Sequence, residues 1–140
     1  MGGLGRAGDL GRDRRRRALR LRRGDVIEVL LDPVIDGEAG TLRPCVVVSS
    51  EGMNAAVTKR SRGVVTCVPM TSNVSNVHID FQVEVADPDD LAQMGLRVPS
   101  KIQAERVRSI GFPRITRSLG VTPGWVMRRL DEALRFHLSL

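Results

Sequence analysis

Aromatic residues, cysteine and histidine are all scarce in this sequence. Aromatic side chains make up 3% of the 140 residues, tyrosine is absent, and there are two cysteines and two histidines. Cys45 and Cys67 each lie in an apolar run with no second cysteine or histidine at metal-ligand spacing, which favours buried free thiols over a disulfide. His78 and His137 belong to no HExxH pattern, and no glycine-rich phosphate loop occurs. We therefore expect no metal site and no cofactor.

Long apolar runs are also missing. No run approaches the length of a membrane span, and the N-terminus lacks the apolar segment of a signal peptide. We therefore expect a cytoplasmic protein that does not associate with a membrane.

Positive charge is plentiful but unevenly distributed. The net charge is +6 and the pI is 10.8, and a large share of the basic residues precedes Gly24. Residues 1–22 are rich in glycine and arginine without apolar periodicity, so we expect a disordered basic arm, followed by one domain over residues 23–140. The arm either contacts RNA electrostatically or has no role. Without it the body is nearly neutral, so the total charge is weak evidence for nucleic-acid binding.

Short apolar segments separated by turn residues dominate the body of the chain and predict short β-strands. We expect strands at residues 23–31, 45–48, 63–68, 81–85, 97–104 and 107–111. The third strand is expected to end at Pro69, because proline cannot donate to the ladder. Residues 51–61 are interpreted as a polar turn with one helical turn at 53–57, and residues 88–91 as a short turn of helix.

The C-terminal segment changes to a helical period. Thr122 is predicted to cap a helix that has Pro123 at its first position. The apolar residues that recur on one face of this helix are Val126, Leu130, Ala133, Leu134 and Leu138. Short strands at regular spacing with one terminal amphipathic helix favour a mainly β fold with α, a small and strongly bent barrel of about five to seven strands.

Arg43 stands at the entrance to the most apolar run of the chain. Pro44 pushes it into an extended conformation, so its guanidinium is anchored next to a buried strand. Thr71, Ser72 and Asn73 follow the next strand, and antiparallel pairing would place Arg43 and Thr71 at the same edge of the sheet. An arginine facing hydroxyl and amide groups suits a phosphate. An ordinary surface ion pair between Arg43 and Glu38 is the competing interpretation.

These residues, with several motifs in order along the chain, resemble the MazF/PemK family of toxin endoribonucleases. The similar segments are residues 23–25, 31–33, 43–49, 68–73, 81–83, 105–109 and 131–134. The resemblance covers residues 23–140. It departs from the family at Asp36-Gly37 and at Glu105-Arg106, where many members carry other residue pairs.

The resemblance implies an SH3-like barrel with a terminal helix, a homodimer, and metal-independent cleavage of single-stranded RNA at short sequences. It also implies an antitoxin that blocks the activity. In the family, residues matching Arg43 and Thr71 carry the reaction, and the acid matching Glu38 supports the site. Attack of the RNA 2′-hydroxyl on the adjacent phosphorus would leave a 2′,3′-cyclic phosphate and a 5′-hydroxyl.

Further residues are candidates for binding RNA on the same resemblance. They lie after the third strand, in the loops at 53–62 and 74–80, and near Glu105, and they are Ser72, Asn73, Lys59, His78, Arg106 and Arg108. Because aromatic residues are few, we expect base recognition to rely on hydrogen bonds and phosphate contacts. Two other functions stay open, a gyrase-inhibiting toxin relative and a non-catalytic SH3-like nucleic-acid-binding module.

Overall fold

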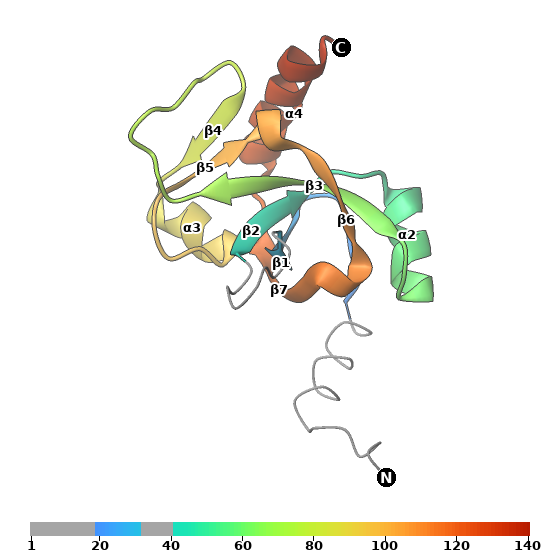
Figure 1. Ribbon diagram of the computed structural model, residues 1–140. Coiled ribbons are helices and arrows are strands. Elements are labelled where there is room, and N and C mark those ends of the chain that lie inside the picture. Colours follow the sequence, from blue (N-terminus) through green and yellow to red (C-terminus); the bar gives the residue numbers. More distant parts are fainter. Residues whose placement is uncertain (1–18, 32–40) are drawn as a thin grey trace, which may run out of the picture.

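The computed structural model describes residues 19–31 and 41–140, and these residues form a seven-stranded antiparallel sheet with three α-helices (Figure 1). The strands are β1 (Asp25–Leu30), β2 (Leu42–Val47), β3 (Val64–Thr71), β4 (Gln82–Val85), β5 (Ser100–Gln103), β6 (Arg108–Gly111) and β7 (Ile115–Val121). The helices are α2 (Glu51–Arg60), α3 (Pro88–Met94) and α4 (Gly124–Leu138), with 3-10 turns η2 (Ala104–Arg106) and η3 (Phe112–Arg114).

The sheet follows an open path. Its strand order is β4-β5-β3-β2-β1-β7, and β6 pairs with the first half of β3. The predicted mainly β fold with a C-terminal helix is therefore confirmed, but the described strands do not close into a complete barrel. Strand β7 was not predicted, because three consecutive polar residues, Thr116, Arg117 and Ser118, interrupt the apolar alternation of residues 115–121.

Both faces of the central strands are buried, each in its own apolar core. Along β2, Val46 belongs to one core, and its neighbours Cys45 and Val47 belong to the other. The first core contains the buried face of α4, with Val126 and Leu130. The second core is covered by α2, by η3 and by the residues just before β1. The continuous apolar run in β2 thus has the double burial that its composition predicted.

The ordered domain begins earlier than predicted. Leu19 and Leu21, which the sequence analysis placed in the basic arm, are 8% and 4% exposed and belong to the second core. The backbone N–H of Leu21 also donates to the Thr58 hydroxyl at 3.0 Å. Burial of two leucines offsets the cost of ordering this short segment. The rest of the predicted arm, residues 1–18, lies outside the described residues.

Two local predictions were wrong at the ends of elements. The segment 51–61 is a ten-residue helix, α2, rather than a turn, and Ser50 caps it by accepting a hydrogen bond from Met53 N–H. Strand β3 continues through Pro69 to Thr71. Proline is tolerated there because Pro69 lies between the part of β3 that pairs with β6 and the part that pairs with β5.

The C-terminal helix starts later than predicted. Its first residue is Gly124 and its N-cap is Pro123, while the hydroxyl of Thr122 is buried without a hydrogen-bond partner. The apolar face is confirmed where it is covered, since Val126, Leu130 and Ala133 are buried.

Candidate active site

The pairing of β2 with β3 brings Arg43 and Thr71 together. The register pairs Cys45 with Pro69 and Val47 with Cys67, so continuing it by two residues places Arg43 opposite Thr71. Both residues alternate with members of the first core, Val46 on β2 and Met70 on β3, so both side chains lie on the other face of the sheet. The shared edge expected from antiparallel pairing is thus present.

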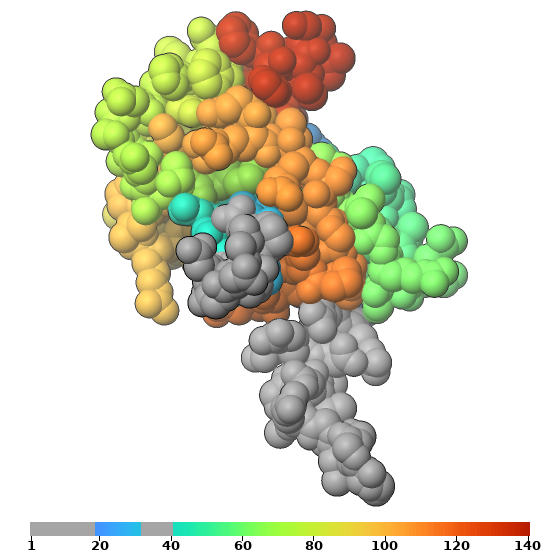
Figure 2. Space-filling view, viewed as in Figure 1, coloured from blue at the N-terminus to red at the C-terminus, as the bar shows by residue number. Residues whose placement is uncertain are grey.

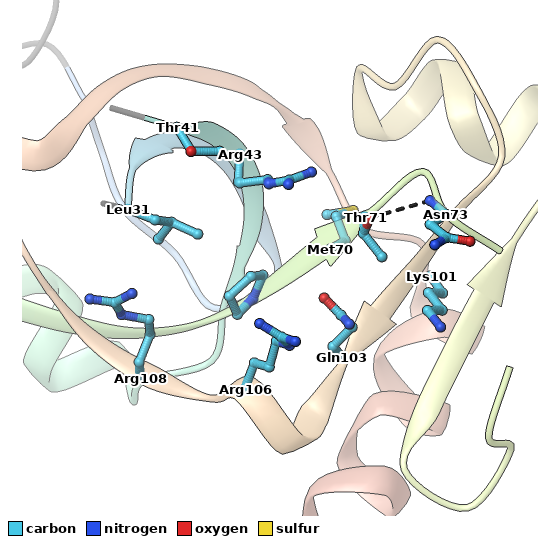
Figure 3. Close-up of a pocket in the computed structure, with 11 residues that line it drawn as sticks. Leu31, Thr41, Arg43, Met70, Thr71, Asn73, Lys101, Gln103, Arg106 and Arg108 are labelled. Atoms are coloured by element: carbon cyan, nitrogen blue, oxygen red, sulfur yellow. Dashed lines mark hydrogen bonds between the residues drawn. The ribbon is translucent and has the colours of Figure 1, made fainter. Parts of the chain in front are cut away.

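A cleft of about 430 Å³ opens on this face (Figure 3). Its lining residues come from β2, β3, β5 and the segment around η2, and they are Leu31, Thr41, Arg43, Pro69, Met70, Thr71, Asn73, Lys101, Gln103, Arg106 and Arg108. Figure 3 shows the guanidinium of Arg43 pointing across the cleft toward Thr71. Five predicted site residues therefore share one cavity.

Local hydrogen bonds hold the polar residues that follow β3. The Asn73 backbone N–H donates to the Thr71 hydroxyl at 3.2 Å, and the Asn73 side chain accepts from the N–H and the hydroxyl of Ser75. These side-chain-to-backbone turns fix the chain as it leaves the sheet. Among the described residues the Thr71 hydroxyl only accepts a hydrogen bond, so its proton can be donated to a group in the cleft.

The cleft is strongly cationic. Arg43, Lys101, Arg106 and Arg108 line it, and none of its lining residues in the described part of the chain is acidic. Arginine forks and an ammonium recognise phosphate oxygens, and a hydroxyl and an amide beside them add neutral donors. The arrangement can therefore bind a phosphodiester and stabilise negative charge that develops on it.

The two β5 residues that line the cleft, Lys101 and Gln103, were not among the predicted site residues. They alternate with Ile102 in a short strand, and only the pairing of β5 with β3 brings them to Thr71. The sequence does show a polar residue on each side of a buried isoleucine, which indicates that Lys101 and Gln103 share one face of a strand. Which site they reach depends on the strand that pairs with β5, and local sequence does not specify that strand.

Four predicted residues lie elsewhere or are not described. Ser72 borders a neighbouring hollow of about 250 Å³ that also reaches Arg43 and Thr71. Lys59 is exposed on α2. Helix α2 lies near the start of β3, at the far end of that strand from Thr71 (Figures 1 and 2). Glu38 lies outside the described residues.

His78 does not line the cleft but forms part of an aromatic stack. Its ring lies 5.0 Å from that of Phe81, and Phe81 lies 6.2 Å from Phe136 of α4, with nearly parallel planes in both pairs. The three rings therefore link the loop after β3 to the C-terminal helix. This stack brings aromatic faces to the surface, which the low aromatic content did not suggest.

The two cysteines are buried free thiols, as predicted. A hydrogen bond with Cys67 and burial both raise the pKa of the Cys45 thiol, so it stays protonated and unreactive. Among residues 19–31 and 41–140, no three histidine, cysteine or acidic side chains are grouped to hold a metal ion. In the same part of the chain, no helix is long and apolar enough to span a membrane.

The sequence and the fold are both similar to those of known proteins. Residues 22–138 match the family model of the PemK-like, MazF-like toxins of type II toxin-antitoxin systems. The chain is 43% identical over 120 residues to endoribonuclease MazF9 of Mycobacterium tuberculosis, covering 86% of this chain and 98% of that protein. It is 27% identical over 120 residues to endoribonuclease EndoA of Bacillus subtilis, covering 86% and 96% of the two chains.

The fold agrees with these sequence matches. A mycobacterial endoribonuclease in complex with its cognate antitoxin superposes with a TM-score of 0.63 at 21% identity, covering 84% of this chain and 94% of that one. The matching motifs, the sheet with its C-terminal helix and the family model extend over the same residues. The chain therefore belongs to the PemK-like, MazF-like toxin family of type II toxin-antitoxin systems.

Proposed function

We propose that this protein is a sequence-specific endoribonuclease toxin that cleaves single-stranded RNA without a metal ion. The observation that carries the proposal is the convergence of Arg43 and Thr71 in one cationic cleft, in a chain that is 43% identical to a curated endoribonuclease. RNA provides the nucleophile in its 2′-hydroxyl. The protein must position that hydroxyl in line with the leaving oxygen and stabilise charge on the phosphoryl group.

The reaction leaves a 2′,3′-cyclic phosphate and a 5′-hydroxyl. The 2′-hydroxyl gives up its proton as its oxygen forms a bond to phosphorus. The bond from phosphorus to the 5′-oxygen breaks, and the leaving oxygen takes up a proton, so no net proton is gained or lost. Arg43 suits the charge-stabilising role, because its guanidinium stays protonated and offers two parallel donors to phosphoryl oxygens. Its high pKa makes it a poor proton donor. Thr71 would orient the phosphate, and Glu38 would support the site from the loop before β2.

The other cleft residues suit binding of the RNA strand. Asn73 lies beside Thr71, and Arg106 and Arg108 continue the positive surface along the cleft. Ser72 and the loop that carries His78 lie next to it, where flanking nucleotides would pass. Lys59 is too far along β3 for the same cleft and would contact a more distant part of the RNA.

Assembly and regulation complete the proposal. We propose a homodimer in the cytoplasm whose RNA-binding cleft is blocked by a cognate antitoxin, as the complex of a structural relative suggests. Large apolar side chains exposed at the end of α4, which include Phe136, Leu138 and Leu140, support a further contact surface. The molar mass of the purified protein, measured by light scattering with and without antitoxin, tests this assembly.

The decisive experiment compares the wild type with Arg43→Ala. The purified protein is incubated with RNA and the 5′ ends of the products are sequenced, which also identifies the bases that are read. Arg43→Ala should lower the cleavage rate by at least about 10³-fold, because it removes the charge that stabilises the phosphoryl group. Arg128→Ala, which removes an exposed arginine of α4 outside the cleft, serves as the matched control.

Two results would contradict the proposal. Equal cleavage by Arg43→Ala and the wild type would remove the mechanism, and loss of all activity in excess EDTA would indicate a metal enzyme. Binding of RNA without any cleavage products would instead favour the non-catalytic nucleic-acid-binding module. The melting temperature of Arg43→Ala should stay near that of the wild type, because the side chain is exposed.

A further inference from the structure

Lys101 lies on the opposite side of Thr71 from Arg43. Strand β5 pairs with β3 so that Lys101 is opposite Thr71 and Ile102 is opposite Met70. Ile102 and Met70 belong to the first core, so Lys101 shares the cleft face with Thr71. The three strands β2, β3 and β5 therefore present Arg43, Thr71 and Lys101 as one row across the sheet.

The Lys101 residue is largely buried, and its ammonium group has no charged partner among the described residues. The residue is 9% exposed, and its Nζ donates a short hydrogen bond to the backbone carbonyl of Asn76. No ion pair of Lys101 exists among the residues that the structure describes. An ammonium group has three N–H donors, so two of them have no protein acceptor there.

Within the described residues, nothing balances the positive charge of Lys101. One hydrogen bond to a neutral carbonyl leaves a largely buried lysine without a counter-charge there. The remaining cleft residues in the described part of the chain cannot supply the charge, because Arg43, Arg106 and Arg108 are all cationic. An anion that enters the cleft would satisfy Lys101, and for a protein that binds RNA this anion is a phosphate.

The direction of the side chain decides which phosphate fits. Figure 3 shows Arg43 reaching toward Thr71, whereas the ammonium end of Lys101 points away from Thr71 and lies beyond Asn73. Neighbouring strands are about 4.8 Å apart, so the backbones that carry Arg43 and Lys101 are separated by about 10 Å. Two cations at this separation, directed differently, suit two consecutive phosphates better than one.

We propose that Lys101 binds the RNA phosphate next to the scissile linkage, while Arg43 binds the scissile one. The inference rests on the proposed function, since the scissile linkage is defined by it. RNA would then cross the sheet from β2 to β5, with Thr71 between the two phosphates. Lys101 would also keep Asn76 in place, so that the loop after β3 borders the bound strand.

The experiment measures binding of an RNA that cannot be cleaved. The RNA has a 2′-deoxy nucleotide at the cleavage site, and its phosphates are replaced one at a time by neutral methylphosphonates. Dissociation constants are compared for the wild type, Lys101→Met and Lys101→Arg. Arg128→Met is the matched control, because it removes an exposed cation outside the cleft.

The methylphosphonate replacement and the Lys101 substitution should affect binding through the same RNA linkage. In the wild type, neutralising the phosphate next to the cleavage site should weaken binding about tenfold, as expected for one charge-assisted hydrogen bond. Lys101→Met should bind the unmodified RNA about tenfold more weakly. Neutralising the phosphate next to the cleavage site should then cause no further loss of affinity in this variant. Its salt dependence should flatten by about 0.7 in log–log slope, as for one phosphate contact on a single strand. Lys101→Arg keeps the positive charge, so it should retain most of this coupling, that is, the loss of affinity on neutralising that one phosphate.

Stability provides a second measurement. Methionine keeps the length of the side chain and removes an unpaired charge, so Lys101→Met should melt at or above the wild-type temperature. A clearly lower melting temperature, with every methylphosphonate costing the same in both proteins, would mean that Lys101 only anchors the Asn76 loop. That result would overturn the proposal.

The outcome is separable from that of the proposed function. If the wild type cleaves RNA but no linkage couples to Lys101, the inference about Lys101 fails alone. If coupling is found but the wild type cleaves no RNA, the endoribonuclease proposal fails and Lys101 remains a phosphate-binding residue.

Discussion

The two faces of the sheet differ sharply around the cleft, although the same strands form both. On one face Met70 and Ile102 are 1% and 0% exposed and pack with residues of α4. On the other face their immediate neighbours, Thr71 and Lys101, line the cleft, which Met70 also borders although it is 1% exposed. One step along the chain therefore separates a residue of the core from a residue of the candidate site.

Charged side chains on the two faces also differ in their partners. Glu28 lies on the side of Val26, which belongs to the first core, and its carboxylate accepts hydrogen bonds from Thr116 and Arg117. Lys101 on the cleft face has no such partner among the described residues. A satisfied charge contributes to folding, whereas an unsatisfied one is available for a ligand. Substitutions on the two faces should consequently separate stability from activity.

The largest effect on stability is expected from Ile102→Ala. This substitution leaves a cavity between Met70 and Val83, which face Ile102 from the two neighbouring strands. Truncation of a fully buried isoleucine costs about 2–5 kcal/mol, to be measured by urea unfolding. The cleavage rate per folded molecule should stay within a few-fold of the wild type. A loss of activity without a loss of stability would mean that the faces are not separable.

Thr71→Val should have the opposite profile. Valine has nearly the same shape but lacks the hydroxyl, so the cleavage rate should fall by about 10²-fold, as for loss of one donor to a developing charge. The free energy of unfolding should change by less than about 1 kcal/mol, because the Thr71 side chain is partly exposed and water can satisfy the Asn73 N–H. Single-turnover cleavage and urea unfolding of the same preparation decide between the two profiles.

The smallest effect is expected from Glu28→Gln, and it depends on pH. Burial alone would raise the pKa of Glu28, but the hydrogen bonds from Thr116 and Arg117 outweigh it and hold the pKa below its usual value of 4.5. A carboxylate with a lowered pKa stabilises the fold above pH 4.5, and this contribution is lost as the pH falls through the folded-state pKa. The melting temperature of the wild type should therefore fall more steeply below that pH than that of Glu28→Gln.

Asp25 provides an internal check on the sign of this prediction. Burial raises the pKa of Asp25, despite hydrogen bonding to Arg22. Its effect on the stability of the fold is therefore opposite to that of Glu28, and becomes more favourable as the pH falls. Because Asp25 is present in both proteins, the difference between their melting curves isolates Glu28. Parallel curves for the wild type and Glu28→Gln would contradict the assignment.

Local sequence predicted much of the fold correctly. The apolar run before Val48 predicted a central strand, and the helical period after Pro123 predicted α4. It failed where tertiary context changed the meaning of a residue. Pro69 lies within β3 because its missing N–H falls between two partner strands, and α2 forms although its sequence shows little amphipathic pattern.

The candidate site also contains residues that local sequence could predict and a residue that it could not. Arg43 and Thr71 could be placed at one edge from the sequence, because they lie at the ends of consecutive strands and short connections favour antiparallel pairing. Their catalytic roles, and that of Glu38, remain predictions. Lys101 could not be assigned, since β5 reaches β3 only after β4 and α3 have intervened in the chain.

What the sequence determined by itself was the alternation within each strand, and with it the side chains that share a face. This alternation is a property of neighbouring residues, and a shift of one residue would expose the whole apolar set. What only the tertiary structure decided was the order of the strands and the row of Arg43, Thr71 and Lys101 across them. That row depends on contacts between distant segments, whose pairing is selected by the packing of both cores at once.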